Sequence, residues 1–390
     1  MTLYSLSMHI FYLCYEDLRE VHRGSTRHVT EVVTQLGVLG HQVDLFVPTP
    51  PPPGTFGEGV MVHVIRSIPI RMVDWMLFYI FSALAMCLLG LRRRPDAIYM
   101  RELAYDLFPI IVAWFLRRPL LIEVNGPLLN EMKQIGAGPF ELGLIRLSQR
   151  WTFAAADRVI VVAAPLRDWL IGLYQLPEEQ VVVIPNGTDP DRLHPMDMDT
   201  SQQHAGLPEG PVVGFVGSCY PYHDIDTLIS AAPGIVQAHP KVRFAIVGDG
   251  YMRPVWMDRV KKENLSDYFL FPGLVAYEEI PTYINAFTVC ISLVKNSMGS
   301  PVKLYEYMSC GRPVVASDYQ GIGDVVAAHQ AGISVPGYDA EAVTVAVNRL
   351  LGDPELCCEM GRRGREAVEQ EFSWRRVASD IVDVIKKTSN

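Results

Sequence analysis

Short apolar runs alternate with helical patterns along almost the whole of this 390-residue chain, and no other feature constrains its fold as strongly. The first series of runs reads HIFYLCY, QVDLFVP, AIYMR, LLIEV and RVIVVA. The second reads VVGFVGS, RFAIVGDG, YFLFPGLV, VCISLV, RPVVAS and GISVP. Apolar strands separated by helices are typical of parallel sheets that helices cover on both faces. Two such series in tandem predict an α/β protein with two Rossmann-like domains.

A cluster of turn-forming residues separates the two series. The stretch PNGTDPDRLHP, residues 185–195, is rich in Pro, Gly, Asn and Asp, which favour turns and loops. We expect a first domain over residues 1–185, a second over 186–365 and a last helix in 366–390. Ligands of such sheets bind beyond the carboxyl ends of the strands, so we expect the site in a cleft between the two domains.

Composition excludes several classes of protein. Hydrophobic residues make up 49% of the chain and charged residues 20%, which is enough apolar material for a core and excludes a disordered chain. The net charge of −9 argues against nucleic acid as a partner. The seven cysteines contain no C-x-x-C pair, which favours reduced thiols over a disulfide framework or a zinc site. We therefore expect a cytoplasmic protein with no bound metal or cofactor.

One stretch is almost entirely apolar. It reads WMLFYIFSALAMCLLGL over residues 75–91 and is followed by Arg92, Arg93 and Arg94. Its length lies at the lower edge of the roughly 17–25 residues that span a bilayer. We favour a buried or half-buried helix, because the strand pattern resumes at once with AIYM. A peripheral contact with the inner face of an anionic membrane through Trp75–Arg94 is the second alternative, and a transmembrane span is the third.

A second notable stretch is GSPVKLYEYMSCG, residues 299–311. Ser300 fits an N-cap, Pro301 fits a first helical position and Gly311 fits the residue after the helix, so a helix is predicted over 301–310. Lys303 then lies in the first turn, next to the positive end of the helix dipole. This arrangement costs about 0.3–1 kcal/mol unless something compensates for it.

A bound anion would compensate for that charge. Backbone N–H groups at the start of the helix and the ammonium of Lys303 could bind one phosphate together. Glu306 lies one turn further on the same face and could accept hydrogen bonds from the hydroxyls of a ribose. This layout suits a nucleoside diphosphate. The alternative is a surface pair of Lys303 and Glu306 that contributes little to stability.

Several segments together resemble the signature of glycosyltransferase family 4, retaining enzymes of GT-B fold. They are GSTRHVTEVVTQLGVLGHQVDLF, VVVIPNGTD, FVGSCYPYHDIDTLISAA, AIVGDG, FPGLVAYEEIPTYINAF, SPVKLYEYMSCGRPVVAS and FSWRRVA. They occur in the expected order and cover most of the chain. The resemblance implies two Rossmann-like domains whose parallel sheets face each other across a cleft. The first would bind the acceptor and the second the nucleotide sugar, and the last helix would cross back to the first domain.

The resemblance implies an activity as well as a fold. It implies transfer of a sugar, with retention and without a metal, from a nucleotide-diphosphate sugar to an acceptor hydroxyl in polysaccharide, glycolipid or glycoconjugate biosynthesis. The nucleotide (UDP, GDP, ADP or TDP), the sugar and the acceptor stay open, and the acceptor could be a sugar, a lipid-linked molecule or a small molecule. Glu306 would hold the ribose, and Lys303 would bind the diphosphate together with Gly299, Ser300 and Pro301.

The sequence departs from the family pattern at the donor site. Met298 occupies the position of the first of two family glutamates, so backbone N–H groups would have to hold the sugar. Ser218 and His223 replace an arginine and a lysine that bind donor phosphates in many members. We expect Lys303 to take over that role, with His223 helping if it is protonated.

Two further motifs each have two interpretations. Gly248 and Gly250 follow a strand in the sequence GDG, where they either approach the nucleotide or form a tight turn. Asp224 and Asp226 form the sequence DID, which either binds a metal or opens a helix. We favour the helix, because Asp is a common N-cap.

Candidate acceptor contacts come from the first domain. They are Gly24, Ser25, Arg101, Glu102, Asn125, Gly126 and Glu131. Gly24 and Ser25 precede the first predicted helix, and Arg101 and Glu102 follow a strand. Asn125 stands where the family often has a histidine; it can bind a sugar hydroxyl but cannot act as a base. A branch of the family resembles this chain in its sequence EVN-x-PL-x-x-E.

The front-face mechanism attributed to the family needs no carboxylate nucleophile, because the leaving phosphate takes the proton of the acceptor hydroxyl. Lys303, Glu306 and Asn125 are therefore the candidate catalytic residues. Two other functions remain as alternatives: another GT-B enzyme such as a nucleotide-sugar epimerase, and a non-catalytic subunit that binds a nucleotide sugar.

Overall fold

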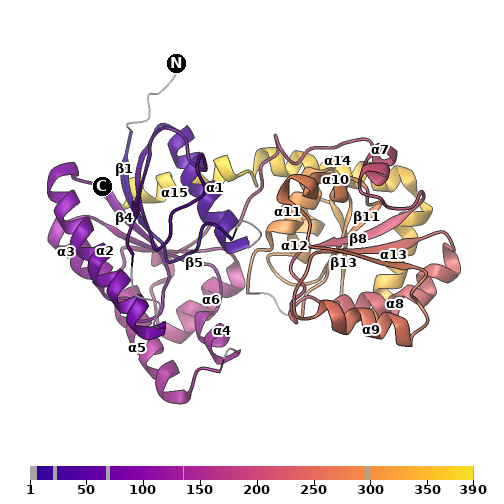
Figure 1. Ribbon diagram of the computed structural model, residues 1–390, viewed down its shortest axis with the longest axis horizontal. Coiled ribbons are helices and arrows are strands. Elements are labelled where there is room, and N and C mark those ends of the chain that lie inside the picture. The colour runs from indigo at the N-terminus through magenta and orange to yellow at the C-terminus, as the bar shows by residue number, and fades with distance from the viewer. Residues whose placement is uncertain (1–6, 21–23, 67–70, 135, 296–297, 390) are drawn as a thin grey trace. The chain divides into compact units, whose positions relative to one another are not determined.

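The computed structural model describes residues 7–20, 24–66, 71–134, 136–295 and 298–389 (Figure 1). Its contacts divide the chain into two compact units. The first comprises Met1–Pro185 and Trp374–Asn390, and the second comprises Asn186–Ser373. Each unit contains one parallel sheet wrapped by helices, which confirms the predicted α/β class with two Rossmann-like units.

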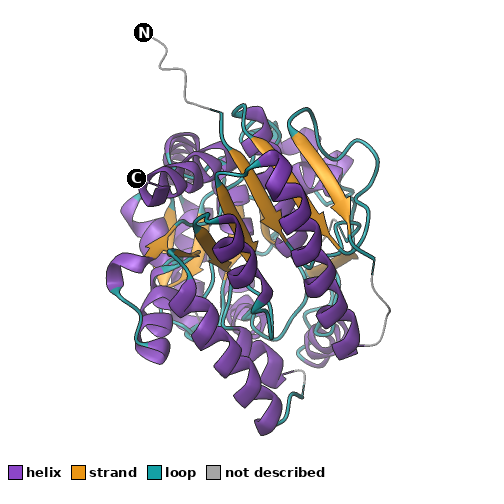
Figure 2. Cartoon of the chain, turned by 90° about the vertical axis from the view of Figure 1, so that its left-hand side faces the viewer, coloured by secondary structure: helices purple, strands orange, loops and turns teal. Residues whose placement is uncertain are grey.

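The first unit is built on a seven-stranded sheet with the order β3-β2-β1-β4-β5-β6-β7, in which every neighbouring pair is parallel. The strands are β1 (His9–Leu13), β2 (Gln42–Val47), β3 (Val60–Val64), β4 (Ala97–Arg101), β5 (Leu120–Val124), β6 (Arg158–Val161) and β7 (Val181–Val183). The central strands are buried along almost their whole length, because helices cover both faces of the sheet (Figure 2).

The helices of the first unit fall into two layers. They are α1 (Gly24–Val38), α2 (Arg71–Arg93), α3 (Phe108–Leu116), α4 (Leu128–Gln134), α5 (Pro139–Ala155), α6 (Ala164–Tyr174), the short 3₁₀ helix η1 (Glu178–Gln180) and α15 (Trp374–Ser389). The crossovers that contain α2, α3 and α5 run across the sheet in the opposite direction to the crossover that contains α1. Because such crossovers are right-handed, these three helices cover the face opposite to α1. Helix α15 packs against α1.

Helix α2 contains the apolar stretch and is half-buried, as predicted. Phe78, Tyr79 and Met86 on its inner side belong to the core under the sheet. The hydroxyl of Tyr79 donates a hydrogen bond to the backbone oxygen of Ala104, 3.0 Å away. The helix joins β3 to β4, which is the β–α–β position inferred from the sequence. Its length and composition would also suit a membrane span over Asp74–Arg93.

A buried carboxylate fastens the end of α2 to the sheet. Asp44 on β2 accepts hydrogen bonds from Arg93 Nη1 at 2.8 Å and contacts the Nε2 atoms of His9 and His63, each at 2.6 Å. Burial by itself would raise the pKa of Asp44. The hydrogen bonds from His63 and His9 and the charge of Arg93 outweigh burial, so the pKa lies well below its usual range. This cluster joins β1, β2, β3 and α2.

The second unit is built on a six-stranded parallel sheet with the order β10-β9-β8-β11-β12-β13. Its strands are β8 (Val212–Val216), β9 (Arg243–Val247), β10 (Phe269–Gly273), β11 (Val289–Ser292), β12 (Val314–Ser317) and β13 (Gly332–Val335). The helices are α7 (Met198–His204), α8 (Ile225–Ala238), α9 (Arg253–Lys262), the 3₁₀ helix η2 (Tyr277–Glu279), α10 (Ile280–Asn285), α11 (Val302–Ser309), α12 (Gly323–Ala328), α13 (Ala340–Gly352) and α14 (Pro354–Gln370).

Two apolar clusters hold the helices of the second unit to its sheet. One packs α8, α9 and α13 against the strands, and Trp256 is its largest side chain. The other contains Leu304, Tyr305, Tyr307 and Met308 of α11. The position of α11 is therefore set by aromatic and aliphatic packing against the sheet.

Replacing Asp44 should destabilise the first unit. In Asp44→Asn the half-exposed Arg93 loses its counter-charge and the cluster loses hydrogen bonds to a charged group, so we expect a loss of about 1.5–3 kcal/mol in the free energy of unfolding, measured by urea titration at neutral pH. Because the pKa of Asp44 is lowered by folding, its contribution is present at neutral pH and is lost as the pH falls below the ordinary aspartate range. The stability difference between wild type and variant should narrow in the same acidic range.

Asp168→Asn is the matched control, because Asp168 pairs with the adjacent Arg167 at the surface. An exposed pair of this kind contributes at most about 1 kcal/mol. Equal losses in Asp44→Asn and Asp168→Asn would contradict the role assigned to the buried cluster.

Candidate functional site

Helix α11 begins at Val302 and ends at Ser309, one residue short of the prediction at each end. Pro301 is the N-cap, with an extended ψ of 114°, so it lies outside the helix. The prediction that Ser300 caps the helix is wrong. Its hydroxyl bonds instead with the backbone N–H of Asn186 at 3.1 Å and with the side-chain hydroxyl of Tyr305 at 2.9 Å, and not with a backbone N–H of the first helical turn.

The prediction that Gly311 follows the end of the helix is confirmed. Gly311 has a φ of +65°, the left-handed conformation that glycine adopts most easily after a helix. The carbonyl groups of the last turn also have a cationic partner that the sequence did not reveal. Arg365 on α14 donates from Nη1 to the backbone oxygens of Ser309 at 3.0 Å and Leu193 at 2.8 Å. A cation at this end favours the helix dipole.

Tyr307 fixes α11 against the sheet. Its hydroxyl accepts a hydrogen bond from the backbone N–H of Val216 at 2.8 Å and lies 3.2 Å from the backbone oxygen of the same residue. Val216 is the last residue of β8. The helix is thereby held beside the carboxyl end of this strand, which is the edge where ligands of parallel sheets bind.

The side chain of Lys303 turns toward that same strand end. Its Nζ lies 3.0 Å from Nε2 of His223 and 4.1 Å from the centroid of the Phe215 ring. A Cβ atom on Gly217 would lie 2.5 Å from the Lys303 Nζ, so only glycine leaves room for the ammonium there. Lys303 therefore lies over the end of β8 within its own unit.

The surroundings of Lys303 change its ionisation. Burial lowers its pKa to about 7, and the negative charge of Glu306 opposes this shift without cancelling it. The ammonium packs against an aromatic ring and an imidazole, neither of which is negatively charged. A lysine in such surroundings is stabilised as a cation by any anion that approaches it.

His223 does not meet the condition of being protonated in the free protein. Burial, followed by the positive charge of Lys303, lowers the pKa of His223 well below its usual value. The imidazole is therefore neutral near pH 7. A neutral ring nitrogen can accept a hydrogen bond from the Lys303 ammonium, which fits their separation of 3.0 Å.

The other donor candidates lie around this lysine or just before its helix. Glu306 is buried one turn further along α11, near enough to act on the pKa of Lys303. Ser218 is half-buried directly after Gly217. Met298 and Gly299 are half-buried and lead into Ser300 and Pro301.

Three glycines allow the backbones of the loops after β8 and β9 to pack closely beside Lys303. Gly217, Gly248 and Gly250 all have positive φ angles, and a Cβ on Gly248 would lie 2.0 Å from the backbone oxygen of Gly217. Backbone hydrogen bonds join the two loops, from Cys219 to Asp249 at 2.9 Å and from Gly217 to Val247 at 3.0 Å. These contacts explain Gly248 and Gly250 as parts of a tight turn. Sequence reasoning missed Gly217, although a glycine directly after a buried strand is a visible signal.

The DID sequence opens a helix, as predicted. Asp224 is the N-cap of α8, and its carboxylate accepts hydrogen bonds from the N–H and the hydroxyl of Thr227. Asp226 contacts Arg259 and Lys295, each at 3.1 Å. Both carboxylates are thus committed to contacts within the protein.

In the first unit, a buried carboxylate organises the carboxyl ends of β4 and β5. Glu123 on β5 lies 2.8 Å from Nε2 of His28, and it accepts hydrogen bonds from the Tyr99 hydroxyl and the Asn125 amide. Burial alone would raise its pKa. The charge and hydrogen bond of His28, followed by the charge of Arg101, outweigh burial and lower the pKa to about 2.

Sequence reasoning missed Glu123 and its pairing with His28. The signal for Glu123 was a carboxylate inside the apolar run LLIEV, since an acid in a buried strand requires a partner. The imidazole of His28 also packs edge-on against Trp374 of α15, with ring centroids 5.4 Å apart. The last helix therefore contributes to this part of the first unit.

The structure brings several acceptor candidates together, but it places Gly24 and Ser25 inside a helix. Gly24 and Ser25 are the first residues of α1 and not a loop before it, which corrects the prediction; residues 21–23 lie outside the described part of the chain. Arg101 donates from Nη1 to the backbone oxygen of Ser25 at 3.0 Å. The carboxylate of Glu131 folds over Gly126, where a Cβ would lie 2.5 Å from its Oε1.

Glu102 points to different partners. Its carboxylate accepts a hydrogen bond from Gln149, whose amide oxygen in turn accepts one from Tyr174 at 2.5 Å. Burial raises the pKa of Glu102 to about 8, despite the opposing hydrogen bond from Gln149. The structure therefore separates Glu102 from the Glu123 group, although Arg101 next to it belongs to that group.

Two family models match the chain in tandem. Residues 22–192 match the model described as Glycosyltransferase Family 4, and residues 210–353 match the one described as Glycosyl transferases group 1. Together they match well over half of the chain, and they divide it close to the boundary between the two units.

Curated relatives are similar over part or all of the chain. The 2-deoxystreptamine glucosyltransferase of Streptomyces kanamyceticus is 29% identical over 60% of this chain, which spans 62% of that protein. A glycogen synthase of Mycobacterium tuberculosis is 23% identical over 97% of this chain and 94% of its own length.

Solved structures share the fold along the whole chain. A sucrose-phosphate synthase from Thermosynechococcus elongatus has a TM-score of 0.75 at 21% identity and covers 97% of this chain and 98% of its own. HepE of Anabaena in complex with UDP has a TM-score of 0.74 at 17% identity and covers 97% and 100%. These matches concern the GT-B fold. With the two family models, they show that this chain belongs to the glycosyltransferases of GT-B fold that resemble family 4.

Proposed function

We propose that this protein transfers a sugar from a nucleotide-diphosphate sugar to an acceptor hydroxyl, with retention and without a metal ion. The observation that carries the proposal is the ammonium of Lys303, held over the carboxyl end of β8 with a pKa lowered to about 7. An ammonium in that position lacks a directly bonded carboxylate in the described chain and gains most from a bound phosphate.

The donor would bind with its diphosphate at the start of α11. Lys303, the first-turn N–H groups of the helix and the backbone at Gly299 and Ser300 would surround the phosphate oxygens. The buried Glu306 lies one turn further along the helix, at a separation that suits the hydroxyls of the ribose. Because HepE binds UDP in its crystal structure, UDP is the first nucleotide to test here.

The transfer step needs one bond to form and one to break. The acceptor oxygen attacks the anomeric carbon from the face on which the diphosphate leaves, and the bond from that carbon to the phosphate oxygen breaks. The hydroxyl proton passes to the departing diphosphate, so atoms and charges balance without a protein nucleophile. Lys303 would stabilise the negative charge that develops on the leaving group. Asp224 and Asp226 are bonded within the protein, which supports a reaction without a metal at the DID sequence.

The acceptor would bind in the first unit, at the carboxyl ends of β4 and β5. Asn125 is oriented by its hydrogen bond to Glu123, which leaves its amide oxygen to accept a hydrogen bond from a sugar hydroxyl. Arg101 is held by Ser25 beside it. Relatives named as acting on 2-deoxystreptamine, D-inositol 3-phosphate and glycogen support an acceptor rich in hydroxyl groups.

Removing the ammonium should slow transfer strongly. In Lys303→Ala we expect a decrease in kcat of roughly 10²–10³-fold, the usual effect of losing one preorganised donor to a developing oxyanion. Release of UDP from UDP-sugars in the presence of an acceptor mixture measures it. Lys262→Ala is the matched control, since Lys262 lies at the surface in a pair with Asp258. Equal rates in both variants, with unchanged circular dichroism spectra, would remove Lys303 from the site.

Nucleotide binding should be linked to a proton on Lys303. Its pKa of about 7 in the free protein would rise when a diphosphate binds, so binding above pH 7 takes up a proton and weakens as the pH rises from 7 to 9. Calorimetry at pH 8 in two buffers of different ionisation enthalpy measures this uptake for UDP. Because the pKa of His223 is lowered, His223 stays neutral at pH 8 in the free protein.

Lys303→Arg is the control for this linkage, because arginine stays charged throughout the pH range. UDP binding to the variant should show no proton uptake and a flat pH dependence between 7 and 9. If wild type and Lys303→Arg took up the same number of protons, the lowered pKa of Lys303 would not be part of nucleotide binding.

A further inference from the structure

The outer side of α2 is apolar although it faces away from the core. Its inner side is buried in the first unit, and a helix of this kind normally turns polar residues outward. Arg92 and Arg93 at its end are exposed and charged, but from Asp74 to Leu91 the exposed positions recur at intervals of about one turn and are all hydrophobic. They are Met76, Ile80, Phe81, Leu84, Leu88 and Leu91.

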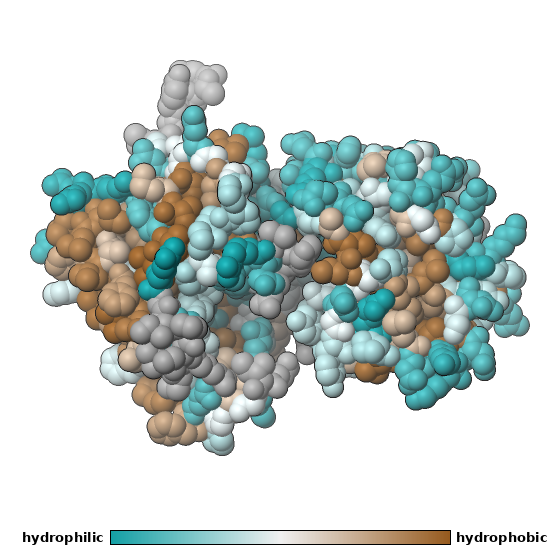
Figure 3. Space-filling model, in the orientation of Figure 1, coloured by the Kyte–Doolittle hydropathy of each residue, from teal (hydrophilic) through white to brown (hydrophobic). Residues whose placement is uncertain are grey.

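The neighbouring helices on the same side of the sheet continue this pattern. Helix α3 contacts α2 and exposes Ile111, Trp114 and Phe115, and its N-cap residue Leu107 is exposed as well; Trp114 is 78% exposed. Helix α5 exposes Phe140, Leu144, Leu147 and Trp151 along one side. Figure 3 shows hydrophobic residues gathered over α2 and α3. We call the exposed residues of these three helices the apolar face.

Such a surface is unusual for a protein in water. Single exposed hydrophobic residues are common and need no explanation, but contiguous patches on adjacent helices mark interaction sites. Two exposed tryptophans, Trp114 and Trp151, add to this, because tryptophan favours the boundary between an apolar phase and water.

Arginines gather at one end of the apolar face. Arg92 and Arg94 lie at the carboxyl end of α2, and Arg117 and Arg118 follow α3. Among the described residues, none of these four guanidinium groups has a carboxylate within 4.0 Å. Positive charge without internal partners at the edge of an apolar surface is complementary to an anionic partner.

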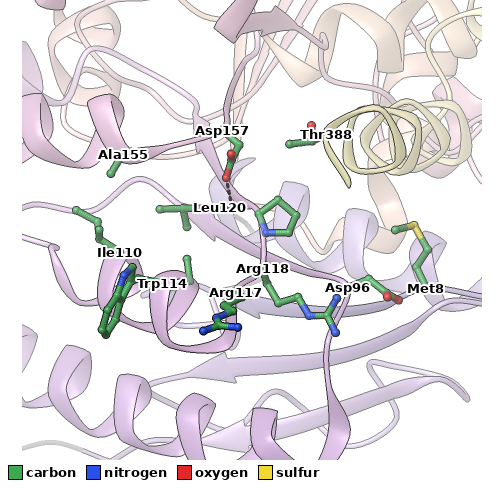
Figure 4. A pocket seen from close by; sticks show the side chains of 12 residues that line it. Met8, Asp96, Ile110, Trp114, Arg117, Arg118, Leu120, Ala155, Asp157 and Thr388 are labelled. Atoms are coloured by element: carbon green, nitrogen blue, oxygen red, sulfur yellow. Dashed lines mark hydrogen bonds between the residues drawn. The ribbon is translucent and has the colours of Figure 1, made fainter. Parts of the chain in front are cut away.

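A cavity lies at this end of the face. Its volume is about 630 Å³, and its lining includes Trp114, Arg117 and Arg118 (Figure 4). Asp96 and Asp157 also line it, but each carboxylate accepts a backbone N–H at 2.8 Å, from His9 and Leu120 respectively. Each acid therefore holds the start of a strand through one oxygen and keeps its negative charge. The two arginines are the groups in the cavity that suit a phosphate.

We propose that the apolar face binds the surface of an anionic membrane, with its tryptophans and leucines at the acyl boundary and its arginines at lipid phosphates. Helices that combine a continuous apolar side with basic residues bind membranes in this way, and anionic lipids attract each surface cation. This inference does not depend on the proposed transfer reaction.

Helix α2 lies on the membrane in this arrangement and does not cross it. Its inner residues Phe78 and Met86 are part of the core, and Arg93 holds its end to the buried Asp44. The Tyr79 hydroxyl ties its middle to Ala104. Crossing a bilayer would pull these side chains from the core and leave Asp44 without its arginine, which is costly.

A second copy of the chain is the competing occupant of the apolar face. The four arginines that have no carboxylate within 4.0 Å in the described chain argue against a second copy. Another copy would bring the same basic edge, whereas lipid phosphates supply the opposite charge. The experiment below separates the two, since self-association occurs without lipid and membrane binding requires it.

Sedimentation with vesicles tests the proposal on the full chain. Wild type should bind phosphatidylcholine vesicles that contain 30% phosphatidylglycerol, bind pure phosphatidylcholine more weakly, and lose affinity as salt is added. Leu84→Gln combined with Leu88→Gln should lower the affinity at least roughly 10-fold, since both residues give up contact with the acyl region. Arg117→Gln with Arg118→Gln should lower it by a similar factor on anionic vesicles and little on neutral ones.

Val345→Gln is the matched control, because Val345 is 63% exposed on α13 of the second unit, outside the apolar face. It should bind vesicles as wild type does. Quenching of tryptophan fluorescence by brominated lipids gives a second measurement. The extent of quenching should be smaller in Trp114→Phe than in wild type, while most of the protein still sediments with the vesicles.

Two results would overturn the proposal. One is that wild type fails to bind anionic vesicles, or that the leucine variant binds as tightly as Val345→Gln. The other is that wild type forms a dimer without lipid, detected by analytical ultracentrifugation, that the leucine variant disrupts. That second result would assign the apolar face to a second copy of the chain.

Discussion

The environment of the Lys303 ammonium is the constraint on which the candidate donor site depends, since no carboxylate among the described residues bonds to it directly. Lys303 packs against the neutral His223 and the ring of Phe215, and burial lowers its pKa to about 7. Glycine at 217 leaves the space, and Tyr307 holds the helix that carries the lysine. The protein thus keeps a cation in surroundings that a bound anion would improve, which is the electrostatic requirement for holding a diphosphate.

The first unit uses the same edge of its sheet with the opposite arrangement of charge. At the carboxyl ends of β4 and β5 the carboxylate of Glu123 is held ionised by His28 and Arg101, and it orients the amide of Asn125. Glu123 and His28 are buried, and half-buried Asn125 is the member of this group that can meet a hydroxyl group. Parallel strands bring such side chains to one edge of the sheet in both units, which is where ligands of these sheets bind.

Helix α2 shows how one element can serve the core and a surface at once. Its inner side completes the core, and Arg93 closes the cluster around Asp44. Its outer side joins α3 and α5 in an apolar face bordered by arginines. Composition alone could not separate a core helix, a surface helix and a membrane span, because all three are apolar. The internal partners of Tyr79 and Arg93 decide between them.

The sequence by itself determined all the strands except β3 and β7, their tandem grouping and the helix that carries Lys303, because apolar periodicity and turn residues are local signals. It also identified Gly311 and Asp224 as helix ends. Only the tertiary structure decided that Ser300 bonds to Asn186 and that His28 meets Glu123. These pairs lie far apart in the sequence, and a hydrogen bond or a pKa depends on what the fold brings within a few ångströms.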